Sequence, residues 1–331
     1  MLDSMATDPL KTPPWTTNAD GEIRRVGVEV EFSGLDPEST ATLVADQFGG
    51  QVERVSEFEF NVTGTSEGEF RIELDMVALK RLGHELEDKK DSLRRSTAEL
   101  VGRIAGTTVP TEIITPPIRW DRLDDINQLI RQLADSGAEG TQESMLFAFG
   151  VHLNPDCPSL ESEVLLRIMQ AYACLHDWLA KMHEVDLVRR ITPFIQPYPV
   201  AYQRHILADD YAPSIEDLIA DYLEFTPSRN RALDMLPVFC CIDEDQVRAV
   251  LPEEKINPRP TFHYRLPNSE VGREHWGIAA AWNGWVTVEQ LATNASLLRK
   301  VAAARESYLD RILRGSEDWV QYIEDECLND L

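Results

Sequence analysis

Apolar and polar residues alternate strictly in the segment Val26–Ser33, which reads VGVEVEFS. This period of two predicts a β-strand, because successive side chains of a strand point to opposite faces of the sheet. One face then carries the valines and Phe32, and the other carries Glu29 and Glu31 side by side. Two neighbouring carboxylates repel each other, and a fold tolerates them well when a cation lies between them. The strand therefore predicts half of a divalent-metal site.

The rest of the chain is expected to be a mixture of strands and helices. The pattern predicts strands at Phe58–Val62, Glu69–Asp75, Val109–Thr115, Ser144–Leu153 and Thr261–Leu266. It predicts helices at Pro37–Gln47, Arg81–Ile104, Arg122–Ala134, Ser159–His183 and Ser214–Phe225, then mainly helix from residue 274 onward. Ser159 and Ser214 are the expected N-caps of their helices, and Arg231–Phe239 is expected to be helical or a turn. Because strands and helices do not alternate regularly, we expect an α+β fold and not a parallel doubly wound sheet.

The composition is that of a globular protein with an acidic surface. The chain has 331 residues, of which 43% are hydrophobic and 27% are charged, enough for one large domain or two ordinary ones. The formal net charge of −25 argues against nucleic acid and against an anionic membrane as partners, because no basic stripe offsets it. A nucleotide bound by such a chain needs metal ions and local arginines around its phosphates.

Cysteine usage and the N-terminal sequence predict a cytoplasmic protein. The five cysteines are an odd number without a CxxC spacing, which favours reduced thiols. Residues 1–20 are polar and contain proline, so we expect a flexible tail and not a signal peptide. No apolar run approaches the length of a membrane span.

Metal-competent side chains recur on other predicted strands. Glu112 lies in PTEIITPP, His152 and Asn154 share a face of FGVHLNP, and His263 and Arg265 share a face of TFHYRLP. A lone glutamate on a strand is more often solvated, and a lone histidine among aromatic residues is more often part of the core. Together in one antiparallel sheet, these strands would gather three carboxylates and two imidazoles. That donor set favours Mg²⁺ or Mn²⁺ over structural zinc.

These four segments resemble the strands of a known ligase superfamily. GVEVEF resembles the Glu-x-Glu strand of glutamine synthetase and glutamate–cysteine ligase, and EIITPP resembles their Glu-x-x-(Ser/Thr)-Pro strand. FGVH resembles their Gly-x-His strand, and TFHYR stands in the place of their Thr-x-Glu-x-Arg strand. The order and spacing match the amidoligase family, a branch of these carboxylate–amine ligases, from about Val26 to about Ala292. The resemblance implies a glutamine-synthetase-type catalytic domain, a curved antiparallel sheet with helices packed on its convex face.

The resemblance also implies a mechanism, with ATP and Mg²⁺ or Mn²⁺ as cofactors. In the family, ATP phosphorylates a substrate carboxylate, and an amine attacks the acyl phosphate to form an amide, which requires charge neutralisation and positioning. Glu31 and Glu112 would hold the metal near the acceptor carboxylate, and Arg265 would contact the γ-phosphate or the acyl phosphate. The metal on the ATP phosphates would be held by Glu29, His152 and His263.

Two further segments carry candidate residues. The segment Phe70–Asp75 resembles a family strand that ends in Asp, which makes Asp75 a candidate catalytic residue, although Met-Val follows where Gly-Ser is common. A solvated aspartate at a strand end is the alternative. The segment Pro227–Asp234 resembles a family Arg/Tyr-x-x-Leu-Asn stretch. Its candidates for contacts to phosphate or to a substrate carboxylate are Arg229, Asn230 and Arg231, with a basic surface loop as the alternative.

The main departure from the family pattern is His263, which stands where a glutamate is usual. A histidine can ligate Mn²⁺ or Mg²⁺ but brings no negative charge. Three interpretations are open: an altered metal preference, a subfamily with a two-histidine site, or weakened catalysis. Because the other site residues are present, we expect activity.

We expect a flexible tail at 1–20, a catalytic domain at 21–292 and a helical appendage at 293–331. Three functions stay open: an ATP-dependent carboxylate–amine ligase, a metal-dependent hydrolase, and a non-catalytic nucleotide-binding relative. A ligase should release ADP and phosphate only with an acid and an amine both present, whereas a hydrolase needs no ATP. The expected substrates are a small-molecule or peptide carboxylate and an amine, with amino acids, peptides and cell-wall precursors as candidates. Homo-oligomer formation is left open.

Overall fold

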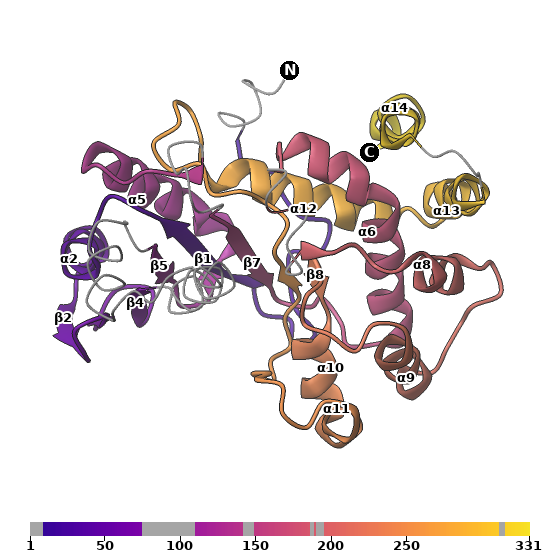
Figure 1. The fold of residues 1–331 in the computed structure, drawn as a ribbon, viewed down its shortest axis with the longest axis horizontal. Coiled ribbons are helices and arrows are strands. Elements are labelled where there is room, and N and C mark those ends of the chain that lie inside the picture. The colour runs from indigo at the N-terminus through magenta and orange to yellow at the C-terminus, as the bar shows by residue number, and fades with distance from the viewer. Residues whose placement is uncertain (1–8, 75–109, 142–148, 186–188, 190–194, 311–314) are drawn as a thin grey trace, which may run out of the picture.

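The computed structural model describes residues 9–74, 110–141, 149–185, 189, 195–310 and 315–331. The predicted helix at Arg81–Ile104, the candidate Asp75 and the first part of the predicted strand Ser144–Leu153 lie outside these ranges. Within them, one sheet runs through the centre of the molecule between groups of helices (Figure 1).

The sheet has nine strands in the described part of the chain, ordered β2-β3-β4-β5-β1-β7-β9-β8, with β6 paired to the start of β1. The strands are β1 (Arg25–Phe32), β2 (Gln51–Arg54), β3 (Glu59–Thr63), β4 (Phe70–Leu74), β5 (Thr111–Ile114), β6 (Ile118–Arg119), β7 (Val151–Pro155), β8 (Leu233–Asp234) and β9 (His263–Tyr264). The pairings between these strands are antiparallel, which confirms the predicted antiparallel sheet.

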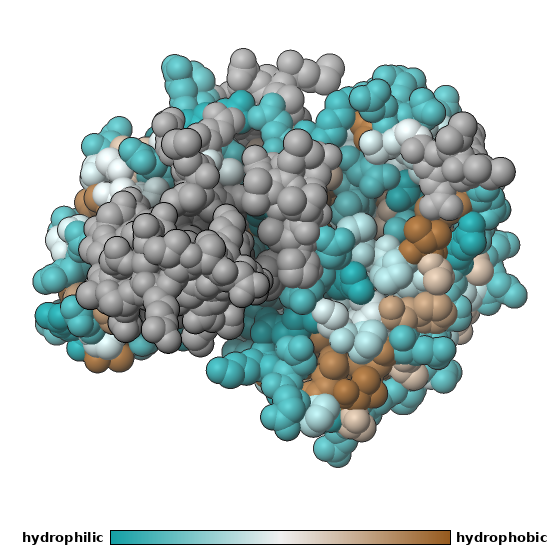
Figure 2. Space-filling view, in the orientation of Figure 1, coloured by the Kyte–Doolittle hydropathy of each residue, from teal (hydrophilic) through white to brown (hydrophobic). Residues whose placement is uncertain are grey.

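The helices are α2 (Pro37–Phe48), α5 (Leu123–Asp135), α6 (Ser162–Met182), α8 (Val200–Leu207), α9 (Ile215–Phe225), α10 (Leu236–Ile242), α11 (Glu244–Val250), α12 (Ile278–Thr293), α13 (Ala295–Leu309) and α14 (Ser316–Glu326), with the short 3₁₀ turns η1 (Trp120–Arg122) and η4 (Leu328–Asp330). No helix within the described ranges combines the length and the apolar character that crossing a membrane requires. In the space-filling view, much of the described surface on this face is hydrophilic, with an apolar area over α10 and α11 (Figure 2).

Strand β1 separates an apolar face from a polar one. Its side chains Val28, Val30 and Phe32 are at most 2% exposed and belong to the same buried cluster as apolar residues of α2, α5, α6 and α12. Glu29 and Glu31 alternate with them and are half-buried on the opposite face. The predicted division of this strand into two faces is therefore confirmed.

Three local predictions are wrong. Helix α6 begins at Ser162 with Glu161 as its N-cap, because the Ser159 hydroxyl accepts the Glu161 N–H in the preceding turn. The segment Arg231–Phe239 contains strand β8 before α10, because β8 pairs with β9. The predicted strand Thr261–Leu266 is reduced to the two residues of β9. By contrast, the Ser214 cap of α9 is confirmed, since its hydroxyl accepts the N–H of Asp217.

Both terminal segments contact the central part of the molecule. Near the N-terminus, the Lys11 N–H donates to Asn283 Oδ1 of α12 at 2.8 Å, and Trp282 Nε1 donates to the Lys11 carbonyl at 2.9 Å. Near the C-terminus, Trp319 Nε1 of α14 donates to the Cys174 carbonyl of α6 at 2.8 Å. Pro9 and Lys11 of the expected tail therefore contact α12, and the domain boundaries at 20 and 292 stay predictions.

A buried ion pair joins the residue before β1 to α12. Arg24 Nη2 lies 2.6 Å from Glu289 Oε1, and both side chains are at most 2% exposed. Arg24 Nε also donates to the Asp156 carbonyl at 2.8 Å, and Trp285 Nε1 donates to Glu289 Oε1 at 2.7 Å. Because additional hydrogen bonds surround both charges, the pair meets the condition under which a buried ion pair is tolerated.

Replacing Glu289 with alanine would leave a buried guanidinium without its counter-charge. We expect the free energy of unfolding to fall by about 3–5 kcal/mol, measured by urea denaturation. The double variant R24M/E289L should recover much of this loss, because no unpaired charge remains in the core. A single Glu289→Ala variant as stable as the wild type would contradict the assignment.

Candidate metal centre

Strand register brings four of the predicted metal ligands together. Glu31 of β1 is paired with Glu112 of β5, and Glu29 of β1 is paired with His152 of β7. Directly paired residues on antiparallel strands lie on the same face. The carboxylates of β1 are therefore flanked by a third carboxylate on one side and by an imidazole on the other.

His263 reaches the same face from β9. Its neighbour Tyr264 pairs with Leu153 of β7, and both of these side chains are fully buried in the core. Because side chains alternate along a strand, His263 lies on the opposite face, together with His152. On its other side, His263 is paired with Asp234 of β8.

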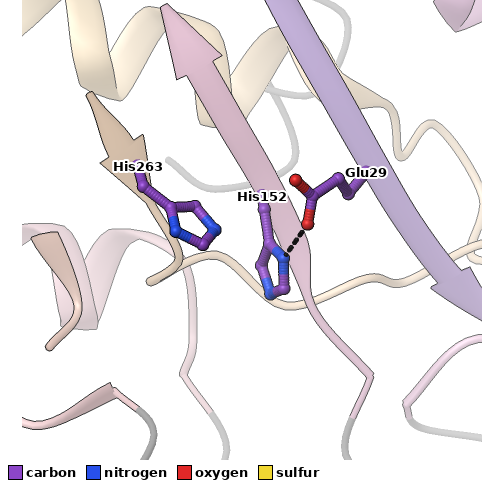
Figure 3. A group of neighbouring side chains, drawn as sticks. All are labelled: Glu29, His152 and His263. Atoms are coloured by element: carbon purple, nitrogen blue, oxygen red, sulfur yellow. Dashed lines mark hydrogen bonds and ion pairs between the residues drawn. The ribbon is translucent and has the colours of Figure 1, made fainter. Parts of the chain in front are cut away.

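The ligand atoms form two adjoining groups. In the first, which we call the histidine group, one ligand atom from each residue lies within 4.8 Å of the others, and the members are Glu29, His152 and His263. In the second, the carboxylate group, the same limit holds for Glu31, Glu112 and His152. Figure 3 shows how the members of the histidine group converge from three neighbouring strands. The two groups share His152 and are therefore adjacent.

Glu29 is held as a carboxylate. His152 Nδ1 lies 2.6 Å from its Oε2, and Asn154 Nδ2 donates to its Oε1 at 2.9 Å. Burial raises the pKa of Glu29, but the hydrogen bond and the positive charge of His152 outweigh burial and hold this pKa well below its usual value. Arg259 Nη2 donates to Asn154 Oδ1 at 2.7 Å, which fixes the orientation of the amide.

His263 is buried, and its ring nitrogens are available to a ligand. The residue is 5% exposed, and neither ring nitrogen has a hydrogen-bond partner among the described residues. Burial lowers the pKa of His263 to about 4, so the ring is neutral at pH 7 and can offer a lone pair. Buried polar atoms are nearly always hydrogen-bonded in native proteins. A bound metal ion would satisfy one of these nitrogens, so the residues present fit a metal site.

Gly150 forms two hydrogen bonds with Glu31 and leaves space beside it for His152 and Arg189. Its N–H donates to Glu31 Oε2 at 2.8 Å, and its carbonyl accepts the Glu31 N–H at 3.1 Å. A Cβ atom at position 150 would lie 2.8 Å from Arg189 Nη2 and 3.2 Å from His152 Nε2. A larger residue would therefore displace either the histidine or the arginine. The Arg189 guanidinium in turn donates to the carbonyls of Arg265, Leu266 and Pro267 at 2.6–2.9 Å, which fixes the chain after β9.

Guanidinium groups lie on the β8–β9 side of the site. Arg265 Nη1 donates to the Arg229 carbonyl at 2.9 Å, and Arg265 Nε is buried without a partner in the described part of the chain. Arg229 Nε lies 3.4 Å from Asp234 Oδ2. Burial lowers the pKa of Arg265, while the charge of Asp234 acts in the opposite direction. Arginine stays protonated in proteins, so this side of the site is positively charged.

Within the described residues, the predicted Arg231 and Asn230 make their hydrogen bonds to neighbouring loops and not to the two ligand groups. Arg231 donates to Thr226 Oγ1 and to the Pro197 carbonyl, the latter at 3.3 Å, so its guanidinium is bonded to neighbouring loops. Asn230 donates its backbone N–H to Ser228 Oγ at 3.0 Å. The predicted contacts of these residues to phosphate or substrate stay predictions.

Several residues at the site escaped the sequence prediction. Asp234 lies in a strand of only two residues, which is too short to show a pattern. Arg189 and Arg259 lie outside the named strands and helices and have no motif. Glu73 of β4, which is paired with Glu112, extends the row of carboxylates, and the alternation in FRIEL could have indicated it.

Glu31→Gln tests whether the facing carboxylates repel each other. Glutamine keeps an acceptor for the Gly150 N–H but removes one charge opposite Glu112. In EDTA we expect the free energy of unfolding to rise by about 0.5 kcal/mol, and we expect the stabilisation that Mn²⁺ gives the wild type to shrink. Thermal melts with and without Mn²⁺ measure both, with the exposed Glu57→Gln as control. An unchanged Mn²⁺ effect in Glu31→Gln would count against the carboxylate group.

Comparison with known proteins agrees with the geometry. A family model described as "Putative amidoligase enzyme" matches residues 22–287, from just before β1 into α12. A search of curated proteins finds no match. The matched region includes every strand of the described sheet and every residue of the two ligand groups. The chain belongs to this amidoligase family.

Proposed function

We propose that this protein is an ATP-dependent carboxylate–amine ligase that forms an amide bond through an acyl phosphate. The observation that carries the proposal is the pair of adjoining metal-competent groups that share His152. Transfer of a phosphoryl group depends mainly on positioning and on neutralising charge, for which two adjacent cation sites beside partly buried arginines are suited. Membership of the amidoligase family supports the amide-forming part of the reaction.

In this proposal, each of the two ligand groups holds a different metal ion. The histidine group would hold the ion on the ATP phosphates, and the carboxylate group would hold the ion near the acceptor carboxylate. Mg²⁺ or Mn²⁺ bound there would neutralise the phosphate oxygens and orient the transferred group. Arg265 would donate its free Nε–H to a phosphate oxygen. Contacts to substrate or phosphate are also proposed for Asp75, Arg229, Asn230 and Arg231.

The proposal also covers the fold type, the substrates and the cellular compartment of the protein. We assign the sheet to the glutamine-synthetase type, supported by its antiparallel order and by the site on the face opposite the apolar face of β1. The partners would be a small-molecule or peptide carboxylate and an amine in the cytoplasm. Free cysteines support a reducing compartment.

The test is ADP release from ATP and Mg²⁺ or Mn²⁺, measured with panels of amino acids and peptides as acids and amines. We expect release only when an acid and an amine are both present. With an ¹⁸O-labelled carboxylate, one ¹⁸O atom should appear in phosphate, because the amine breaks the C–O bond of the acyl phosphate and phosphate leaves with the bridging carboxylate oxygen. Glu29→Gln should reduce turnover at least about 100-fold, since even residues behind metal ligands cost 10–100-fold.

Two other results would contradict the proposal. Metal-dependent cleavage of peptides or amides without ATP would identify a hydrolase that uses the same acidic face. Binding of ATP with metal, but no turnover with any acid and amine, would identify a non-catalytic relative.

A further inference from the structure

The histidine group differs from the carboxylate group in its donor atoms. It offers two imidazoles and one carboxylate, whereas the carboxylate group offers two carboxylates and one imidazole. Mg²⁺ prefers oxygen ligands, and imidazole nitrogen suits later divalent metals of the first transition row. Two adjoining sites with opposite donor preferences would therefore hold different ions.

The charge of the histidine group points in the same direction. An imidazole binds a metal ion through the lone pair of its neutral form, so Glu29 supplies the only negative charge among these three ligands. A hard ion such as Mg²⁺ gains most of its binding energy from oxygen ligands of high negative charge. Transition metals also gain from the bonds to nitrogen, so they lose less at this site.

Asp234 lies beside Nδ1 of His263 and is itself held by a backbone N–H. Asp234 is fully buried, and its Oδ1 accepts the Leu236 N–H at the start of α10 at 3.0 Å. Its Oδ2 lies 3.5 Å from His263 Nδ1 and 3.4 Å from Arg229 Nε. A carboxylate beside Nδ1 favours the tautomer that carries the proton there, which leaves Nε2 as the ligand.

The ring of His263 is also directed at the other members of the group. Its centroid lies 5.4 Å from that of His152, with the ring planes at 78°. Figure 3 shows the His263 ring turned toward His152 and Glu29. Asp234 therefore lies behind His263, on the side of strand β8, and does not itself belong to the ligand group.

We propose that the histidine group selects a first-row transition-metal ion over Mg²⁺, and that Asp234 is the positioning residue that presents His263 Nε2 to this ion. The inference rests on the metal centre of the proposed function but not on its ligase chemistry. It assigns a distinct metal to one of the two groups and a role to a residue outside both.

The experiment measures binding of the metal alone, without substrate or turnover. Mn²⁺, Co²⁺ and Mg²⁺ are titrated calorimetrically into the wild type and into the single variants Glu31→Gln, His263→Glu and Asp234→Asn. The same titrations are made with the double variant that combines His263→Glu with Asp234→Asn. Visible absorption of Co²⁺ reports ligation by nitrogen. Glu31→Gln weakens the carboxylate group and so isolates binding at the histidine group, and the exposed Asp217→Asn is the matched control for Asp234→Asn.

We expect Co²⁺ to bind the histidine group at least about 10-fold more tightly than Mg²⁺, with the affinity for Mn²⁺ between the two. His263→Glu should reduce or invert the ratio of the Co²⁺ affinity to the Mg²⁺ affinity, and it should change the visible spectrum of bound Co²⁺. Asp234→Asn should weaken Co²⁺ binding about 10-fold in the wild type but leave it nearly unchanged in His263→Glu, because its effect acts through the histidine.

Equal affinity of the histidine group for Mg²⁺ and Co²⁺ would overturn the proposed selectivity. A ratio of the two affinities that His263→Glu leaves unchanged would overturn it as well. An equal effect of Asp234→Asn in both backgrounds would overturn its positioning role and indicate a structural one. These readouts need no turnover, so an active ligase with a Mg²⁺-selective histidine group would overturn this inference alone. Selective binding in a protein without ligase activity would overturn the proposed function alone.

Discussion

Burial of one face of β1 is the constraint on which the site depends. Val28, Val30 and Phe32 are nearly inaccessible to solvent, and full burial of such side chains is worth about 1.5–3 kcal/mol each. A slip of one residue in register would move this set to the open face and bury both glutamates instead. Burial of an unpaired carboxylate is far more costly than exposure of a valine. The hydrophobic core therefore fixes where Glu29 and Glu31 point.

Pairing with β1 fixes the positions of the ligands on the neighbouring strands. Once β1 is fixed, pairing with β5 places Glu112 beside Glu31, and pairing with β7 places His152 beside Glu29. Like charges directly opposite each other destabilise a sheet, so the fold accepts a cost at this point. Such local violations of folding rules are expected at functional sites. Here the cost has a simple explanation, because a cation between the groups would remove it.

Part of this could be predicted from the sequence and part could not. The alternation of period two was sufficient for β1 and its faces, because burial on one side enforces it. The exposed edge strand β2 has no buried side and therefore no pattern. Motif resemblance indicated which strands share the site, whereas their pairing register came from the structure. The contacts of Asp234, Arg189 and Arg259 depend on tertiary packing between distant segments, which no local pattern encodes.

The central claim is that cations bind between the side chains that the sheet brings together. The most direct measurement is anomalous diffraction at the manganese edge, from crystals of the protein equilibrated with Mn²⁺ and a non-hydrolysable ATP analogue. The account predicts anomalous peaks within coordination distance of the histidine group and of the carboxylate group. Well-ordered analogue with no peak at either group, or with peaks only elsewhere on the acidic surface, would contradict it.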